Sequence, residues 1–215
     1  MYSFLKRALD LTVATFAIVF FSPVLILFAL LIKFDGTGGP IFVDISTRVG
    51  KGMKNFYMYK FRSMVPGAHI DFWEKHPELK ELEKEWKKIG KLPIDQDPRI
   101  TWVGRIIRKT DLDELPQLFN VFKGEMSIVG PRAPYPEELE RYMDEYPEIK
   151  KDVERTFQVK PGLTGVWQVS GRNAITIPQR YKMEGDYADR RNVLEDIAVI
   201  IQTPIAMITR RGAVE

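Results

Sequence analysis

An uncharged apolar run near the N-terminus constrains the fold of this chain more than any other feature. Residues 11–32, LTVATFAIVFFSPVLILFALLI, contain no charged side chain. A helix of about 20 such residues is long enough to cross a bilayer. A secretory signal peptide fits poorly, because the apolar part is too long and no small-residue cleavage site follows. A soluble helix is rarely apolar on every face over this length. The run therefore predicts insertion into a membrane.

The dipeptide Ser22-Pro23 lies at the middle of the apolar run. Proline inside a helix removes a backbone hydrogen bond and costs about 3 kcal/mol. The surrounding apolar side chains favour insertion by roughly 6 kcal/mol in total, so the segment still enters the membrane. Each half is long enough to reach about halfway through the hydrocarbon layer. We expect two short helices separated by a break at Ser22 and Pro23.

Basic residues flank the apolar run on both sides. Lys6 and Arg7 precede it, and Lys33 and Arg48 follow it. Because basic residues favour the cytoplasmic side, this distribution suits a re-entrant anchor that enters and leaves on one face. A spanning helix kinked at proline is the alternative. In either case we expect a membrane anchor at 1–34 and one membrane-surface catalytic domain at 35–215.

The composition excludes several kinds of chemistry. A chain of 215 residues can bury one proper core. Its net charge of +3 is only mildly basic, and no RNA-binding or zinc-finger motif is present, so nucleic acid is not an expected partner. The absence of cysteine excludes disulfides and thiolate catalysis. The chain has only two histidines, so a histidine-based metal site or a serine triad is not expected. Acids and cations must therefore carry any chemistry.

The rest of the sequence predicts an α+β domain that contains one small β-hairpin and several amphipathic helices. Residues 192–209 form an apolar helical face, which fits either a core helix or, as we favour, a helix lying on lipid. The hairpin is expected at 41–47 and 55–61 around a glycine turn, and helices are expected at 71–90, 100–109, 112–122 and 136–155, the last interrupted at Pro147.

The densest cluster of acids follows the most basic segment. Residues 99–109, RITWVGRIIRK, hold four cations and no acid, and Asp111, Asp113 and Glu114 come directly after them. The acids are expected in the first turn of a helix, where the helix dipole favours negative charge. One interpretation is a set of surface ion pairs at a helix start. The other is a site that binds a metal ion and phosphates.

Several cations are candidates for holding phosphate beside these acids. Adjacent carboxylates supply the hard oxygens that Mg²⁺ prefers, and nearby cations balance the remaining phosphate charge. A carboxylate can also attack phosphorus directly and form an acyl phosphate. The candidate phosphate-binding residues are Lys60 and Arg62 in KFRSM, Arg105 and Arg108 before the acids, and Arg132 between prolines in VGPRAP.

Motifs along most of the chain resemble those of one family. They are KRALDL at 6–11, the apolar run with its SP dipeptide, KFRSM at 60–64, DPRIT at 97–101, LDELPQLFNVFKGEMSIVGPR at 112–132, and VKPGLTGVWQVSGRN at 159–173. With these motifs the chain resembles the monotopic polyprenyl-phosphate phosphoglycosyl transferases. These bacterial sugar transferases begin capsule, O-antigen and exopolysaccharide synthesis.

The resemblance implies a reaction, a location and residue roles. A UDP-sugar would lose UMP while its sugar 1-phosphate moves to a polyprenyl phosphate, usually undecaprenyl phosphate. By position in the motif, Asp113 matches the nucleophile and Glu114 the carboxylate associated with Mg²⁺. Lys60, Arg105 and Arg132 match candidate phosphate contacts, as does Arg62. The resemblance also implies a re-entrant anchor in the bacterial cytoplasmic membrane with the catalytic domain on its cytoplasmic face. A homodimer is a further expectation.

The chain departs from the family pattern at three positions, and two other functions stay open. Ala133 replaces the second proline of the usual Pro-Arg-Pro motif, which makes the backbone after Arg132 less rigid. Asp111 adds a third acid ahead of the pair, and Trp102 stands where a basic residue is frequent. A metal-dependent glycosyltransferase that uses DQD at 95–97 would release UDP instead of UMP. A non-catalytic adaptor would hold anionic lipid without turnover.

Overall fold

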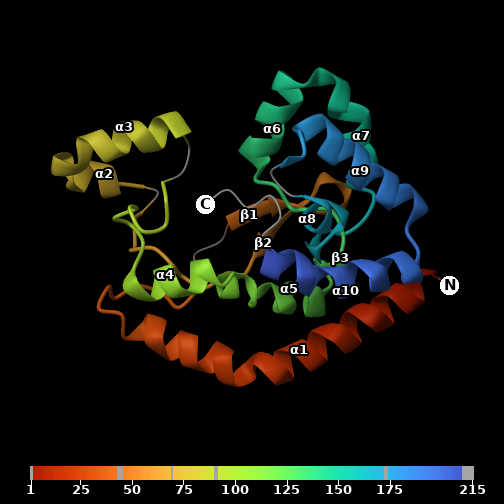
Figure 1. Ribbon diagram of the computed structural model, residues 1–215, viewed down its shortest axis with the longest axis horizontal. Helices are drawn as coiled ribbons and strands as arrows, with labels where there is room; N and C mark the ends of the chain where they lie inside the picture. The colour runs from red at the N-terminus through yellow and green to blue at the C-terminus, as the bar shows by residue number, and fades with distance from the viewer. Residues whose placement is uncertain (1, 43–45, 69, 90–91, 172–173, 210–215) are drawn as a thin grey trace. The chain divides into compact units, whose positions relative to one another are not determined.

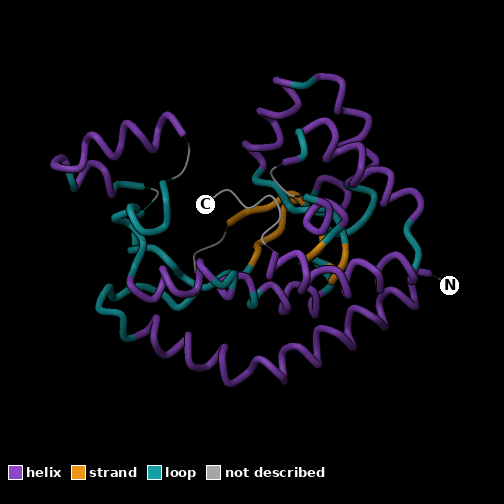
Figure 2. The backbone as a smooth tube through the Cα atoms, in the orientation of Figure 1, coloured by secondary structure: helices purple, strands orange, loops and turns teal. Residues whose placement is uncertain are grey.

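The computed structural model describes residues 2–42, 46–68, 70–89, 92–171 and 174–209. The chain forms two compact units, and each is built from segments distant in sequence (Figure 1). The first unit contains residues 1–20, 45–58 and 117–215, and the second contains 21–44 and 59–116. Both are mainly helical, and the short strands of the two small sheets lie in the first unit (Figure 2). The mixed helix and sheet content confirms the predicted class, whereas the domain boundary predicted after residue 34 stays a prediction.

Helix α1 spans Tyr2–Lys33 without interruption. It is long and apolar enough to cross a membrane. Ser22 and Pro23 lie inside it, so the predicted separation into two helices is wrong for this structure. A single proline removes only one backbone donor, and the apolar residues on both sides continue the helix. Residues of α1 up to Phe20 belong to the first unit, and the remainder belongs to the second.

The apolar side chains of α1 remain largely exposed within the chain. Only 11% of its most apolar window is buried. The exposed fraction is 74% for Phe16, 66% for Phe20 and 60% for Ile26. Contiguous apolar surface of this kind is disfavoured in water and typical of contact with lipid or another protein. The exposure of α1 therefore fits the membrane association that its sequence predicts.

In the second unit, the last turns of α1 pack against helix α4, which spans Trp102–Lys109. The hydroxyl of Thr101 accepts a hydrogen bond of 2.9 Å from the backbone N–H of Gly104 and begins α4 at the predicted place. Gly104 lies so close to the carbonyl of Ser63 that a side chain would not fit there. The shared core consists of Leu25, Phe28, Ile32, Phe61, Val103 and Ile107.

The acid cluster precedes a helix and does not lie within it. Leu112–Glu114 form a 3₁₀ turn, η3, and helix α5 begins only at Gln117 and ends at Lys123. The single helix predicted over 112–122 is therefore wrong, and so is the placement of Asp113 and Glu114 in its first turn. Pro116 explains the interruption, because proline has no N–H to donate to the carbonyl of Leu112 four residues earlier.

The remaining elements of the second unit are short helices in the charged segment at 71–90. A helix was predicted over this whole range, and the structure divides it where proline interrupts. The elements are α2, Phe72–Lys75; the 3₁₀ turn η2, Pro77–Leu79; and α3, Lys80–Ile89.

The first unit contains the predicted hairpin and a second, unforeseen strand pair. Strand β1, Ser46–Val49, pairs antiparallel with β2, Asn55–Met58, around the 3₁₀ turn η1, Lys51–Met53. The described strands are shorter than predicted, and residues 43–45 lie outside the described part. Strand β3, Ser127–Val129, pairs parallel with β4, Gly162–Thr164.

Helices surround these strands in the first unit. Helix formation stops at Glu145 and resumes after Pro147, which confirms the predicted interruption. Helix α10 covers the C-terminal apolar segment, and helices α8 and α9 were not predicted. The elements are α6, Pro136–Glu145; the 3₁₀ turn η4, Pro147–Ile149; α7, Lys150–Thr156; α8, Val166–Ser170; α9, Ile177–Arg190; and α10, Val193–Thr209.

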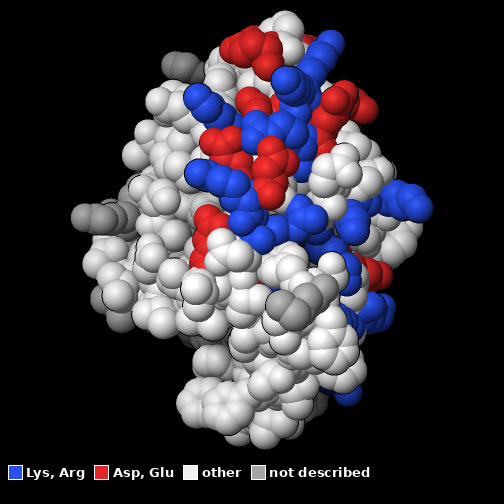
Figure 3. Space-filling model, turned by 90° about the vertical axis from the view of Figure 1, so that its right-hand side faces the viewer, with Lys and Arg blue, Asp and Glu red and all other residues white. Residues whose placement is uncertain are grey.

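Charged side chains join α7 to α9 over the apolar core of the first unit. Arg155 on α7 lies 2.6 Å from Asp152, 2.6 Å from Asp186 and 2.8 Å from Asp189. Figure 3 shows acidic and basic side chains gathered on one face beside an uncharged surface region. Because these pairs are partly exposed, the packing beneath them contributes more to stability than the pairs do.

A buried polar cluster attaches the start of α1 to the first unit. Asp10 accepts hydrogen bonds from Ser127 Oγ at 2.9 Å and from the backbone N–H of Ile128 at 3.0 Å. Lys6 lies 3.1 Å from Asp196 on α10, and the hydroxyl of Tyr187 donates to Asp196 at 2.6 Å. Buried charges persist only when they are paired and hydrogen-bonded, so this cluster fixes how α1, β3 and α10 meet.

We predict that Asp10→Ala destabilises the protein by about 3–5 kcal/mol, because it leaves the buried donors of Ser127 and Ile128 without their acceptor and removes one of the two acids beside Lys6. Thermal unfolding of the detergent-solubilised protein measures the change. Glu81→Ala removes an acid whose side chain is 86% exposed and serves as the control, with no measurable change in Tm expected. Equal Tm values for Asp10→Ala and the unmodified protein would contradict the role of this cluster.

Candidate active site

Lys60 brings the two predicted catalytic carboxylates together. Its Nζ lies 2.9 Å from Asp113 Oδ2 and 3.2 Å from Glu114 Oε1. The neighbouring backbone reinforces the arrangement, because the N–H of Phe61 donates to the carbonyl of Asp113 at 3.0 Å. These residues all belong to the second unit. The structure therefore brings Lys60, Asp113 and Glu114 together, and their roles in binding and catalysis stay predictions.

The two carboxylates differ in exposure. The Asp113 side chain is 5% exposed, whereas the Glu114 side chain is 43% exposed and that of Lys60 is 27% exposed. A ligand can thus reach the side chains of Glu114 and Lys60 from solvent, whereas the side chain of Asp113 is buried next to them. A buried carboxylate beside an accessible acid and a cation is an arrangement suited to reaction with a phosphate group.

Burial and charge shift the pKa values of this cluster. Burial raises the pKa of Asp113, Lys60 opposes the rise and Glu114 adds to it, so the net shift is upward. For Lys60, burial lowers the pKa, but attraction to Glu114 and Asp113 exceeds this effect and the net shift is again upward. Lys60 therefore stays a cation at neutral pH, and Asp113 is more basic than an ordinary aspartate.

Asp111 shapes the turn that presents the pair. Its φ of 54° lies in the left-handed region, which aspartate tolerates better than most residues. The carbonyl of Asp111 accepts a hydrogen bond from the N–H of Glu114 at 3.2 Å and closes the turn. The third acid of the cluster therefore has a backbone role at this site.

The two predicted cations on α4 have different positions. Arg108 Nε donates to Ser63 Oγ at 2.8 Å, and the charge of Arg108 lowers the pKa of Asp113. Arg105 lies on the exposed face of α4. The structure therefore places Arg108 in the electrostatic field of the acid pair, whereas binding of phosphate by Arg105 stays a prediction.

Arg62 is enclosed by protein. Its Nη2 donates to the carbonyl of Ile32 at 2.8 Å and to Asp35 Oδ1 at 3.1 Å, and its Nη1 contacts the hydroxyl of Thr37. The Arg62 and Asp35 side chains are 5% and 0% exposed. These contacts fix the chain that follows α1 and make Arg62 structural in this conformation. A phosphate contact from Arg62 stays a prediction.

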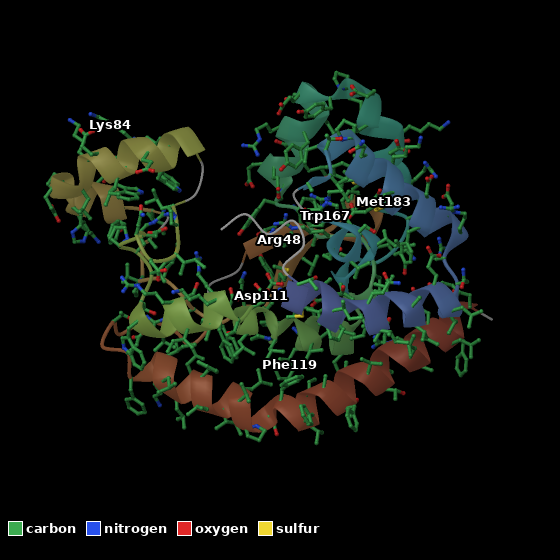
Figure 4. The ribbon with its side chains drawn as sticks, in the orientation of Figure 1. Arg48, Lys84, Asp111, Phe119, Trp167 and Met183 are labelled. Atoms are coloured by element: carbon green, nitrogen blue, oxygen red, sulfur yellow. The ribbon has the colours of Figure 1, made fainter. Side chains whose placement is uncertain are left out.

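Arg132 belongs to the first unit, where Glu184 and Trp167 hold it. The N–H of Arg132 donates to Glu184 Oε1 at 2.9 Å, and its guanidinium lies 5.6 Å from the centre of the Trp167 ring. Arg180 lies 4.6 Å from the same ring and 3.3 Å from Glu184 Oε2 (Figure 4 labels Trp167). The position of Arg132 is therefore fixed by these side chains as well as by the flanking prolines.

Arg180 and Glu184 were not foreseen as supporting residues. Both are fully buried, and burial raises the pKa of Glu184. In the sequence they are a cation and an acid four positions apart, which is also the spacing of an ordinary surface pair on a helix. The burial that distinguishes them arises from packing between elements distant in sequence.

The donor set fits a magnesium ion that is completed by substrate. Asp113 and Glu114 converge on one Lys60 nitrogen, so their oxygens lie close together. No group of three or more acids or histidines suited to a metal occurs among the described residues. Mg²⁺ commonly uses one or two carboxylates and takes its other ligands from water and substrate phosphates. Two converging carboxylates therefore match that mode of binding.

The DQD motif at 95–97 is engaged in ion pairs. Arg99 binds both oxygens of Asp97, with Nε–Oδ1 and Nη2–Oδ2 distances of 2.9 and 2.7 Å. Both residues are 2% exposed, and Asp95 pairs with Lys109 at 2.8 Å. The bidentate contact uses the carboxylate of Asp97 for structure. This geometry disfavours a nucleotide-metal site at DQD.

Most of the chain matches a known family. The family model described as Bacterial sugar transferase matches residues 1–210. This chain belongs to the bacterial sugar transferase family. The similar proteins include the undecaprenyl-phosphate galactose phosphotransferase of Salmonella typhimurium, 43% identical over 98% of this chain, and the UDP-galactose-lipid carrier transferase of Erwinia amylovora, 41% identical over 98% of it.

The relatives differ in length. The chain spans 42% of the length of each of these two proteins. It spans 87% of the exopolysaccharide production protein ExoY of Rhizobium meliloti, which is 37% identical over 97% of this chain. The matched region therefore corresponds to part of the longer relatives and to most of the shorter one.

We predict that Arg62→Met destabilises the protein by about 3–5 kcal/mol, because the buried carboxylate of Asp35 loses its charged partner. Urea unfolding in detergent measures this loss, and Arg105→Met, on the exposed face of α4, is the matched control. If Arg62→Met and Arg105→Met unfold at the same urea concentration, the structural role assigned to Arg62 is wrong.

Proposed function

We propose that this chain transfers a sugar 1-phosphate from a UDP-sugar to a polyprenyl phosphate, with undecaprenyl phosphate as the expected acceptor, and releases UMP. The observation that carries the proposal is the buried, basic carboxylate of Asp113, which lies 2.9 Å from Lys60 beside the accessible Glu114. The printed names of two relatives describe undecaprenyl-phosphate and lipid-carrier transferases and support this choice of substrates.

The proposed reaction has two displacement steps. In the first, an oxygen of Asp113 attacks the phosphorus bonded to the sugar, and the bond from that phosphorus to the bridging oxygen breaks. UMP leaves with the electron pair, and Asp113 carries the sugar phosphate. In the second, an oxygen of the polyprenyl phosphate attacks the same phosphorus and displaces Asp113. The product is a lipid-linked diphosphosugar, and the carboxylate is restored.

Lys60 assists both steps through charge. Before reaction it balances Asp113, and the raised pKa of Lys60 keeps the ammonium protonated. Once Asp113 carries the sugar phosphate as an acyl phosphate, the negative charge of its carboxylate is lost and Lys60 can pair with the phosphate instead. Glu114 and Asp113 would hold Mg²⁺, which neutralises diphosphate charge when bound. The basic character of Asp113 favours attack by that carboxylate.

A covalent route matches a site at a membrane surface. A water-soluble nucleotide sugar and a lipid phosphate need not occupy the site together, so one small site can serve both substrates. We further propose that α1 is re-entrant through a kink at Pro23 that leaves the backbone helical, because basic residues flank the helix on both sides. The catalytic residues then face the cytoplasm of a bacterial cell at its inner membrane.

The re-entrant topology predicts that both ends of α1 are accessible from the same side. The chain has no cysteine, so Ser3→Cys introduces a single label site. In intact cells a membrane-impermeant maleimide should fail to react with it, and in inverted membrane vesicles it should react fully. Labelling from the outside of intact cells would instead show a spanning helix.

We predict that Asp113→Asn lowers UMP release by about a thousandfold or more, because the amide is a poor nucleophile. Asp111→Asn, which keeps the turn, is the matched control and should retain activity. Mass spectrometry of the unmodified enzyme incubated with a UDP-sugar and no acceptor should show a sugar-phosphate adduct on Asp113. Normal turnover in Asp113→Asn, or product formation without any adduct, would refute the covalent route. Release of UDP would indicate a glycosyltransferase, and lipid binding without turnover an adaptor.

The raised pKa of Asp113 predicts the pH dependence of the reaction. Attack requires the ionised carboxylate, so the rate falls as pH falls through this pKa. On the acidic side of the pH profile, kcat/KM should therefore fall with an apparent pKa above about 4, the value of an ordinary aspartate. Lys60 lowers the pKa of Asp113, so Lys60→Met should move this apparent pKa further upward as well as reduce the rate. An unchanged apparent pKa in Lys60→Met would contradict this coupling.

A further inference from the structure

Two cations of the first unit converge beside Gly124, which follows helix α5. A Cβ added to Gly124 would lie 3.2 Å from Lys160 Nζ and 3.6 Å from Arg7 Nη2. The φ of Gly124 is 84°, in the left-handed region that glycine adopts without strain. Gly124 therefore both ends the helix and leaves space next to the two cationic groups.

Arg7 is held in place by the end of α5. Its Nη1 donates to the carbonyl of Val121 and its Nη2 to the carbonyl of Phe122, both at 2.7 Å. These bonds satisfy carbonyls that have no partner within the helix. A guanidinium has five N–H donors, so other donors of Arg7 are available to an additional acceptor. The arginine is thus ordered before any ligand arrives.

The charge of this pair is poorly compensated. Burial lowers the pKa of Lys160, and repulsion from Arg7 and Lys51 lowers it further, while Asp10 opposes the shift. Asp10 already accepts hydrogen bonds from Ser127 and from the N–H of Ile128. Within the described part of the chain, no acid forms an ion pair with Arg7 or Lys160. An anion at this position would reduce the repulsion.

Exposed apolar side chains occur on α1, which carries Arg7, and on α5, whose last carbonyls bind Arg7. The exposed fraction of Phe122, whose carbonyl binds Arg7, is 52%, and that of Phe119, one turn earlier on α5, is 41% (Figure 4). On α1, Phe4 is 78% exposed and Leu5 is 43% exposed. Fixed cations next to exposed aromatic and aliphatic groups suit a ligand that combines an anionic head with an apolar tail.

We propose that Arg7 and Lys160 bind the phosphate of an anionic phospholipid from the bilayer, with its acyl chains against the apolar side chains of α1 and α5. The site uses none of the residues assigned to sugar-phosphate transfer, and it lies in the other compact unit. It would make attachment of the first unit to the membrane depend on the charge of the leaflet. The proposal does not require the proposed reaction to be correct.

Binding of a short-chain phospholipid to the full-length protein in a neutral detergent tests the site. Dioctanoyl phosphatidylglycerol, kept below its critical micelle concentration, is titrated by calorimetry. Lys160→Met should weaken its binding about fivefold, the effect of one basic residue near an anionic surface. Lys151→Met makes the same charge change at an exposed position on α7 and should bind as the unmodified protein does. Equal binding by Lys160→Met and Lys151→Met would overturn the proposal.

Further ligands identify the source of the phosphate. Glycerol 3-phosphate, which lacks acyl chains, should bind at least tenfold more weakly than the phosphatidylglycerol, and dioctanoyl phosphatidylcholine should be insensitive to Lys160→Met. If glycerol 3-phosphate binds equally well, the site recognises free phosphate. If a short polyprenyl phosphate displaces the phosphatidylglycerol at lower concentration, the site belongs to the acceptor lipid. Either result would refute a bilayer phospholipid as the ligand. These measurements need no turnover, so they stand even if sugar-phosphate transfer fails.

Discussion

Buried polar contacts attach each end of an apolar helix to the unit that contains it. The apolar face of α1 is mostly exposed, so apolar packing alone cannot fix its position along its whole length. At its start, Asp10 accepts from Ser127 and Ile128 and Lys6 pairs with Asp196. Beyond its end, Arg62 binds the carbonyl of Ile32 and the carboxylate of Asp35. Such contacts are directional and costly to break, and they remain effective whether lipid or water covers the apolar face.

The candidate active site depends on the second of these attachments. Lys60 pairs with Asp113, Phe61 donates its N–H to the carbonyl of Asp113, and Arg62 binds the end of α1. Three consecutive residues thus connect the membrane helix to the carboxylates. Lys60 and Arg62 have different roles because their partners differ: Lys60 pairs with Asp113, and Arg62 pairs with Asp35. A lysine can reach the site while the arginine two positions later is held inside by its own partners.

The sequence predicts local features of this protein better than it predicts packing between distant segments. The hairpin, the start of α4 and the interruption at Pro147 follow from turn residues, an N-cap and a proline, which act within a few residues. The prediction of one helix over 112–122 is wrong because the helical spacing of apolar residues continues across Pro116, whereas the α-helical hydrogen bonding is interrupted there. Asp113 and Glu114 were identified by their motif, but their pairing with Lys60, which is distant in sequence, depends on the fold. The support that Glu184 gives to Arg132 depends on packing of the same kind.

The same reasoning explains why a count of cations is a poor guide to a phosphate site. Arg62 in KFRSM was a candidate for binding phosphate, yet it is buried against Asp35, just as Arg99 is buried against Asp97. A buried cation that already forms an ion pair with a buried carboxylate gains little free energy by binding a phosphate. The existing ion pair would have to break before the phosphate could bind. Lys60 differs, since reaction at Asp113 removes the negative charge that it balances. Lys160 differs again, because burial and repulsion from Arg7 and Lys51 outweigh the attraction of Asp10. The cations available to ligands are those whose charge the fold leaves uncompensated, or those whose partner loses its charge during catalysis.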